Sequence, residues 1–165
     1  MPMYYTEVPG AIQTTNATPN TANDAYFIKP GSTRAVWLCW AQVQGRAAGL
    51  TALSGISFRL EKWTSTASSA GTSITPSPND VGFQAAKHTA AYSASTLTSG
   101  TGGPTLLGSF GCSVSGPGGW GNPQASTGNL DQAYALEGAA TQSIDIFNVS
   151  ATASLNFECS TGTAE

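Results

Sequence analysis

Residues 34–43 read RAVWLCWAQV and contain the longest apolar run of the chain. In a β-strand, successive side chains point to opposite faces. One face of this stretch would carry Val36, Leu38 and Trp40, and the other would carry Trp37, Cys39, Ala41 and Val43. A strand that is apolar on both faces needs a cover on both. In a small sandwich, the second cover must be a loop or a neighbouring subunit.

Further strand candidates follow in both directions from this stretch. GISFRLEKW (55–63) alternates cleanly, and its inner face would hold Ile56, Phe58 and Leu60 while its outer face would hold Arg59, Glu61 and Trp63. Residues 3–8 are either a first strand or a clinging arm. Residues 85–92 form either a weak strand or a helical turn. Other strands are expected near Ile74 and at 25–29, 105–115, 133–138, 143–150 and 153–160.

The segments between these candidates are rich in glycine, proline, serine and threonine, and loops are expected at 10–24, 64–80, 93–104 and 115–123. No window of a dozen residues combines helical apolar spacing with freedom from glycine and proline. The sequence therefore predicts an all-β fold. We expect an antiparallel β-sandwich, jelly-roll-like with Greek-key connections, of about eight strands with long irregular loops. We expect residues 1–165 to form one domain, in which 1–24 could be an extended N-terminal arm or loop.

The composition limits the classes of partner. Only 9% of the residues are charged, against about 25% in ordinary globular proteins. The six basic residues are scattered and make no track for a phosphate backbone, so no nucleic-acid partner is expected. The start, MPMYYTEVPG, lacks the basic and apolar regions of a secretion signal, and no run is long enough to span a membrane. The three cysteines are expected to be small buried hydrophobes, the alternative being one disulfide plus a free thiol.

One motif resembles a nucleotide-binding fingerprint. Residues 116–121 read GPGGWG, which matches G-x-G-x-x-G after an apolar run. The fingerprint needs a helix directly behind it. Pro123 and Gly128 fall inside that stretch, so the match predicts a contact loop rather than a cofactor site. Trp120, in this loop, either folds back as a lid on the core or anchors a partner.

No residue set indicates catalysis or a resident metal. His88 is the lone histidine, and its position beside Lys87 is typical of a surface residue. The Asn79-Asp80 and Asn23-Asp24 pairs could serve calcium, but such pairs usually form turns or caps. The carboxylates available for glycoside hydrolysis are Asp131, Glu137, Asp145 and Glu158. Asp145 and Glu158 are expected to face solvent on neighbouring strands. We therefore expect no enzyme, cofactor or metal.

Contacts with other proteins are the better expectation for a chain so poor in charge. Tryptophan and arginine are frequent interface anchors. The candidate contact residues are Trp120, Pro117, Trp63, Arg59, Arg34, Tyr4 and Tyr5. A core position is favoured for two of Trp37, Trp40 and Trp63. The alternative is a carbohydrate-binding or receptor-binding module of a phage tail or fibre, in which Trp120 would stack on a sugar.

The stretch TPNTANDAYFIKPGSTRAVWLCWAQVQGRAAGLTALSGISFRLEKW (18–63), followed by TPSPND (75–80) and GPGGW (116–120), resembles capsid decoration, or cement, proteins of tailed bacteriophages. The likeness covers most of the chain and lies in segment order rather than in a diagnostic motif. It implies a β-rich, often jelly-roll fold, a homotrimer and binding to the major capsid protein. The chain would be made in the bacterial cytoplasm, would cement neighbouring subunits on the outer capsid surface, and would carry no catalytic residues.

Overall fold

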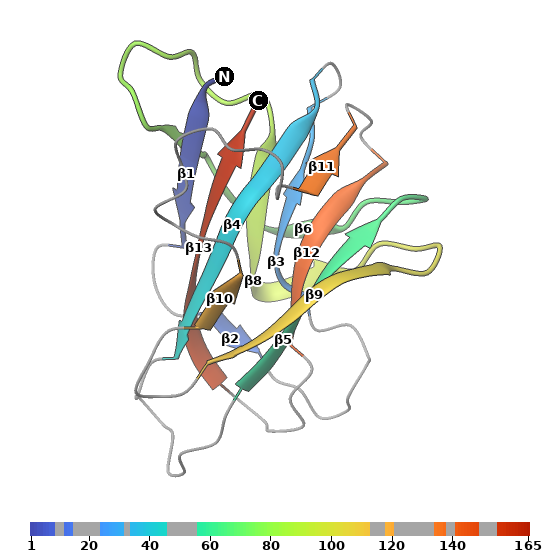
Figure 1. Ribbon diagram of the computed structural model, residues 1–165. Helices are drawn as coiled ribbons and strands as arrows, with labels where there is room; N and C mark the ends of the chain where they lie inside the picture. The colour runs from blue at the N-terminus through green and yellow to red at the C-terminus, as the bar shows by residue number, and fades with distance from the viewer. Residues whose placement is uncertain are drawn as a thin grey trace.

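A computed structural model covers the chain (Figure 1) and describes residues 1–8, 12–14, 24–31, 34–45, 56–112, 118–120, 134–137, 141–148 and 155–165. Within these ranges, regular structure consists of β-strands, so the predicted all-β class is confirmed. The described part of the chain contains no helix that could cross a membrane.

The strands form two antiparallel sheets. Sheet A has the order β10-β4-β13-β1-β7, while β11 also pairs with β4 and β2 with β13. Its strands are β1 (Met3–Glu7), β2 (Ile12–Thr14), β4 (Val36–Gly45), β7 (Ser77–Pro78), β10 (Gly118–Trp120), β11 (Tyr134–Leu136) and β13 (Leu155–Ala164). Sheet B has the order β6-β8-β3-β12-β5-β9. Its strands are β3 (Asp24–Lys29), β5 (Ile56–Trp63), β6 (Ser69–Ile74), β8 (Thr89–Thr98), β9 (Thr105–Cys112) and β12 (Ser143–Asn148).

The two sheets make the expected β-sandwich. Neighbours are mostly distant in sequence, as in Greek-key folds, and the terminal strands β1 and β13 lie side by side (Figure 1). The expected number of about eight strands is too low, since the described residues contain thirteen. The additional strands are mostly short pieces of predicted loop that pair briefly with a long strand, such as β2, β7 and β10. The loop predicted at 93–104 is also wrong at its start, because β8 continues to Thr98.

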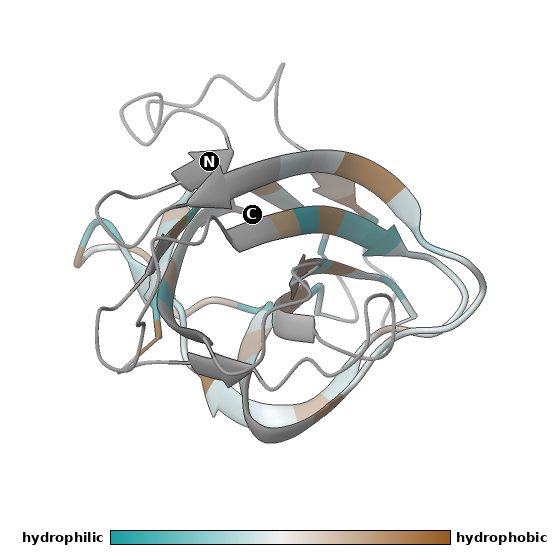
Figure 2. Ribbon diagram, turned by 90° about the horizontal axis from the view of Figure 1, so that it is seen from below, coloured by the Kyte–Doolittle hydropathy of each residue, from teal (hydrophilic) through white to brown (hydrophobic). Residues whose placement is uncertain are grey.

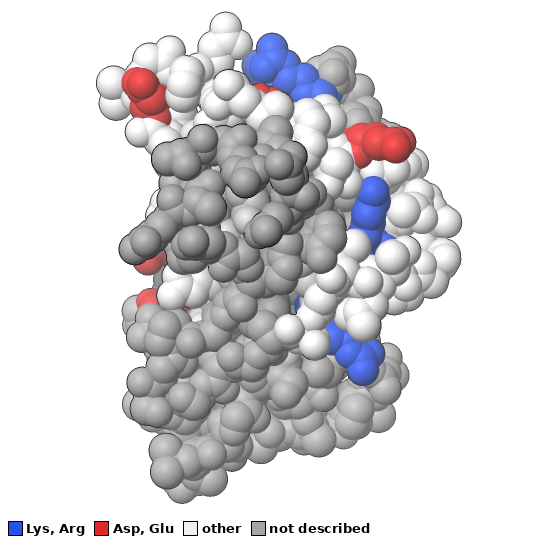
Figure 3. Space-filling model, in the orientation of Figure 1, with Lys and Arg blue, Asp and Glu red and all other residues white. Residues whose placement is uncertain are grey.

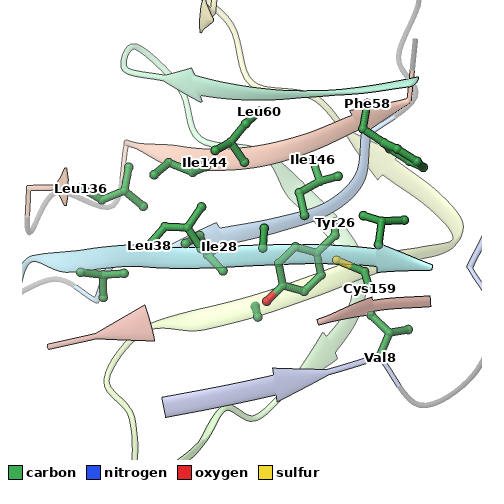
Figure 4. Packing of buried hydrophobic residues seen from close by; sticks show 14 residues of the cluster. Val8, Tyr26, Ile28, Leu38, Phe58, Leu60, Leu136, Ile144, Ile146 and Cys159 are labelled. Carbon is green, nitrogen blue, oxygen red and sulfur yellow. The ribbon is translucent and has the colours of Figure 1, made fainter. Parts of the chain in front are cut away.

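The core lies between the sheets, which curve around a shared interior (Figure 2). Leu38 from sheet A and Ile28, Leu60, Ile144 and Ile146 from sheet B belong to one packed cluster (Figure 4), and all five are buried. Each such side chain gains about 1.5–3 kcal/mol from burial. Tyr26 of β3 reaches across the core, where its hydroxyl lies 2.7 Å from Thr161 Oγ1 of β13. Burial raises the pKa of this tyrosine well above its usual value. The bond ties the two sheets together through the interior.

Strand β4 corrects one sequence prediction. A register shift places Leu38 opposite Thr163 and Trp40 opposite Gly162, which leaves Cys39 as the extra residue of a β-bulge. After the bulge the alternation is inverted, so the core face carries Ala41 and Val43. Trp40 instead lies over Gly162 on the outer face of sheet A. A Cβ added to Gly162 would lie 2.0 Å from the indole nitrogen of Trp40. The predicted two-faced apolar strand is therefore present, but its inner and outer residues exchange after Cys39.

Sheet B is also covered on its outer face. Phe27, Glu61, Trp63, Asp145 and Phe147 are all buried there. Part of the cover is a pair of segments that meet at Thr66 and Thr101, where the Thr101 N–H donates to the Thr66 carbonyl at 3.1 Å. Gly100 sits against Trp63, and an added Cβ would lie 2.5 Å from the indole Cγ. The outer-face placement of Glu61 and Trp63 is correct, but that face is closed.

Candidate functional site

A buried polar cluster joins His88 to the end of β13. The ring Nδ1 lies 2.6 Å from Glu165 Oε1, and Nε2 lies 2.9 Å from Thr163 Oγ1. The Glu165 carboxylate also accepts the backbone N–H groups of Lys87 and His88. The predicted surface position of His88 is wrong, since the residue is 2% exposed. Burial is possible because both ring nitrogens and the adjacent backbone have partners.

The cluster has the hydroxyl–imidazole–carboxylate order of a nucleophile, a base and an orienting acid. Thr163, His88 and Glu165 are all buried, however, so a substrate could not reach the hydroxyl. Burial lowers the pKa of His88, while the hydrogen bond and charge of Glu165 oppose this shift. The imidazole is therefore neutral at pH 7. The cluster fastens the segment before β8 to β13, which makes it a structural element.

A second buried cluster contains two carboxylates. Asp145 on β12 is the register partner of Glu61 on β5, and both side chains are buried under the cover of sheet B. The Ser68 hydroxyl donates to the Asp145 carboxylate, and the Gly100 N–H donates to Ser68 Oγ at 2.8 Å. The Ser68 N–H donates to Ser143 Oγ at 3.1 Å. The predicted solvent exposure of Asp145 is wrong, because these hydrogen bonds hold the covering segments over it.

Sequence reasoning missed the Glu61–Asp145 pair. Alternation correctly places both residues on an outer face but cannot show that the two strands are neighbours in this register. A pair of carboxylates that hydrolyses a glycoside must flank an open substrate site. Neither member of this pair is accessible, so its geometry does not suit such chemistry.

The outer face of sheet A carries an open polar pocket. It has a volume of about 180 Å³ and is lined by Tyr5, Glu7, Gln42, Glu158, Cys159 and Ser160. Glu7, Ser160 and Gln42 form one row across β1, β13 and β4. Ser160, the middle residue of this row, has the smallest side chain, which accounts for the pocket. Glu158, expected at the surface, is half-buried here.

Tyr5 forms the aromatic wall of this pocket. Its ring packs at 5.9 Å from that of Trp40, and its hydroxyl donates to Glu7 Oε2 at 3.2 Å. The pKa of Tyr5 is raised, first by partial burial and then by the negative charge of Glu7. A hydrogen bond from Ser160 opposes this shift without cancelling it. Tyr5 is therefore a neutral, 38% exposed ring beside a carboxylate.

The loop between β7 and β8 presents apolar side chains at its tip. Val81 is fully exposed and Phe83 is 44% exposed. Asp80 shapes the turn, because its Oδ1 accepts the Gly82 N–H at 2.8 Å and its carbonyl accepts the Phe83 N–H at 3.0 Å. The interpretation of Asn79-Asp80 as a turn is thus confirmed. Figure 1 shows this green loop beside the N-terminus.

Both ends of this loop are anchored to the sandwich. The Asn79 N–H donates to the Met3 carbonyl at 2.9 Å, and the Tyr4 hydroxyl donates to the Gln84 carbonyl at 3.2 Å. Further along, Glu165 holds Lys87 and His88. The tip is therefore a supported apolar projection.

The predicted contact residues divide into two groups. Tyr5 and Arg34 are exposed and Arg59 is half-buried, so these side chains can reach a partner. Tyr4 is 1% exposed and Trp63 is 9% exposed, so both belong to the interior and are withdrawn as contact residues. Alternation across β1 separates Tyr4 from its neighbour Tyr5. Burial is favoured for two of Trp37, Trp40 and Trp63, and Trp40 and Trp63 are indeed buried, each on the outer face of its sheet.

The contact loop around Trp120 is only partly described. Residues 118–120 form strand β10, in which Trp120 pairs with Ala41, so the predicted loop is wrong at these positions. Pro117 and the Trp120 side chain lie outside what the structure describes. Whether Trp120 folds back as a lid on the core or anchors a partner therefore stays a prediction from the sequence.

The described residues outside these clusters include two cysteines. Cys39 and Cys159 are free thiols, and burial raises the pKa of both. The Cys112 side chain lies outside the described set. Across the described ranges, no three histidine, cysteine, aspartate or glutamate side chains converge on a metal position. The visible charges in Figure 3 are few and scattered.

The fold and these surfaces define a two-sheet, all-β sandwich with closed polar clusters inside and a small open pocket outside. No protein-family model, curated protein or solved structure matches the chain.

Proposed function

We propose that this chain is a structural protein of a tailed-phage virion that forms a homotrimer and binds the outer capsid surface. It would cement neighbouring major capsid subunits. The sequence resemblance supplies this class of function. The β-sandwich, the low charge and the inaccessible polar clusters are compatible with a role in assembly rather than in chemistry.

The observation that carries the proposal is the apolar tip of the β7–β8 loop. Val81 and Phe83 face water although the loop around them is held by hydrogen bonds. Hiding one such side chain against a partner is worth about 1.5–3 kcal/mol. Because the turn is already shaped, little ordering cost opposes that gain. A supported apolar projection suits insertion between the subunits of a lattice.

Assembly strengthens such a contact in two ways. In a trimer each contact is repeated three times, so a modest affinity per site gives firm attachment once the first site binds. A ligand that binds only the assembled lattice also raises the stability of that lattice by mass action. The proposed protein would therefore raise the temperature at which capsids rupture.

The test combines sizing with capsid binding. Light scattering should give three times the 16.8 kDa mass of the monomer. The purified protein should co-sediment with capsids that lack it and should raise their rupture temperature. A monomeric mass together with no co-sedimentation would contradict the proposal and favour the receptor-binding or sugar-binding alternative.

Variants locate the contact. Val81→Ser combined with Phe83→Ser should abolish capsid binding while leaving folding intact. Leu106→Ser is the matched control, because Leu106 is also an exposed apolar residue but lies on β9 of sheet B. Equal loss of binding in both variants would assign the effect to general surface polarity instead of to the loop.

A further inference from the structure

The pocket on the outer face of sheet A has no role in the capsid contact proposed for the β7–β8 loop. It lies between β1, β13 and β4, and Tyr5 and Glu7 are exposed at its margin. The described lining residues include the exposed carboxylate of Glu7 and no lysine or arginine. An anionic ligand would meet repulsion here. The possible ligands are therefore cations or neutral polar groups.

The lining offers several hydrogen-bond acceptors and one aromatic ring, which are the groups that bind a planar cation. Glu7 presents a carboxylate, Gln42 an amide oxygen and Ser160 a hydroxyl oxygen. The neutral Tyr5 ring adds a π-face, which attracts a guanidinium more readily than a neutral group. A carboxylate bonded to a guanidinium forms hydrogen bonds about twice as strong as those between neutral groups. Glu7 Oε2 accepts the Tyr5 hydroxyl, but an ionised carboxylate has about four lone-pair sites, so Glu7 can also accept the two parallel N–H groups of an arginine fork.

The size of the pocket narrows the choice further. At about 180 Å³ it is smaller than the roughly 300–1,000 Å³ of sites for drug-sized ligands. It accommodates one terminal group but not several sugar rings. The neighbouring aromatic ring, Trp40, packs against Tyr5 and is only 8% exposed. A broad aromatic platform for sugar stacking is therefore not offered by the described residues.

We infer that this pocket binds the guanidinium group of an arginine side chain presented by a partner protein. Glu7 receives the charged fork, Tyr5 stacks on its plane, and Gln42 and Ser160 accept the outer N–H groups. The inference deepens the proposed function and rests on it only in taking the partner to be a protein. It adds a specific polar contact to the apolar one made by the loop.

Matched small probes test the pocket without a capsid. Ethylguanidinium, ethylammonium and methyl α-glucopyranoside are titrated into ¹⁵N-labelled full-length protein at constant ionic strength. Ethylguanidinium should give saturable shifts at the amides of Tyr5, Glu7 and Ser160, with clearly weaker binding of ethylammonium. The neutral sugar should give no saturable shift.

Variants assign the effect to the pocket. Glu7→Gln should weaken ethylguanidinium binding by roughly tenfold, since one charge is removed with little change in shape. Glu137→Gln is the control, because this exposed carboxylate follows β11 outside the pocket. Tyr5→Phe keeps the ring and should retain most of the affinity.

Four results would overturn the inference. These are the absence of saturable ethylguanidinium binding, saturable binding of the sugar, equal affinity for all three probes, and an unchanged affinity in Glu7→Gln. Failure of the proposed function is distinguishable, since the wild-type chain would then bind ethylguanidinium but not capsids. Capsid binding without guanidinium binding would remove only this inference.

Discussion

The outer faces of the two sheets differ in what covers them. On sheet B, Glu61, Trp63 and Asp145 are closed off by the segments around Ser68 and Gly100. On sheet A, Tyr5 and Glu7 remain exposed beside an open pocket. Each outer face carries an aromatic ring and carboxylates. Strand alternation therefore fixes the face on which a residue lies, while the loops decide whether that face meets water.

This difference separates stability from binding. Removing the hydrogen-bonding partner of a buried carboxylate lowers the free energy of unfolding, because the carboxylate stays desolvated without a compensating hydrogen bond. An exposed carboxylate keeps water as its alternative partner. Substitutions on the closed face should therefore change the free energy of unfolding, and those on the open face should change affinity.

The largest expected effect is at the ring of the closed face. Trp63→Ala should lower the free energy of unfolding by about 3–5 kcal/mol, because a large buried side chain is deleted beneath its cover. Tyr5→Ala, on the open face, should cost about 1 kcal/mol or less. Urea unfolding measures both. Equal costs would contradict the distinction between the faces.

A smaller effect is expected from tightening the cover itself. In Gly100→Ala the new methyl group would lie 2.4 Å from the Thr66 carbonyl oxygen and would press on Trp63. Such overpacking costs about 1–3 kcal/mol. Gly82→Ala, in the exposed turn with its nearest neighbour at 3.4 Å, should change stability by about 0.5 kcal/mol at most. Thermal unfolding followed by circular dichroism distinguishes the two variants. An unchanged melting temperature in Gly100→Ala would mean that the cover over Trp63 is loosely packed.

The buried histidine should make the free energy of unfolding depend on pH. Because burial holds the pKa of His88 below its usual value, the unfolded chain binds a proton at higher pH than the native chain. The contribution of neutral His88 to the free energy of unfolding is complete above about pH 6.5. It is lost as the pH falls, by at most about 1.4 kcal/mol per pH unit. NMR titration of the imidazole should give a pKa below 6.5. A value above 6.5 would show that pairing with Glu165 outweighs desolvation.

The smallest effect on stability is expected at the open pocket. Glu7→Gln should leave the free energy of unfolding within about 0.5 kcal/mol of wild type, because Glu7 is solvent-exposed. The same substitution should weaken guanidinium binding, as argued above. Chemical denaturation at two salt concentrations checks the stability. A large loss would move Glu7 from the binding surface to the structural framework.

Much of the fold could be predicted from local pattern. The alternation in residues 55–63 and 143–150 correctly located β5 and β12, and the absence of helical spacing gave the class. The phase of β4 could not be predicted, because the bulge at Cys39 depends on its pairing with β13. The extension of β8 likewise depends on pairing with β6 rather than on its Ser/Thr-rich sequence.

The candidate sites were harder to predict. The sequence predicts Tyr5 as a contact residue but does not indicate Glu7, Gln42 and Ser160, because these residues meet only through the strand order β1-β13-β4. The burial of His88 follows from the distant Glu165, and that of Asp145 from Ser68. Long-range pairing and loop closure carry this information, and neither leaves a local periodic signal.

Hydroxyl-radical footprinting of the protein, free and bound to capsids, tests whether the exposed loop and the open face of sheet A meet the partner. Phe83 and Tyr5 should react in the free protein and be protected on the capsid. Trp63 and Tyr26 should be unreactive in both states, since they are buried in the chain itself. Failure to bind, or capsid-bound protein in which Phe83 and Tyr5 react as strongly as in solution, would contradict the account.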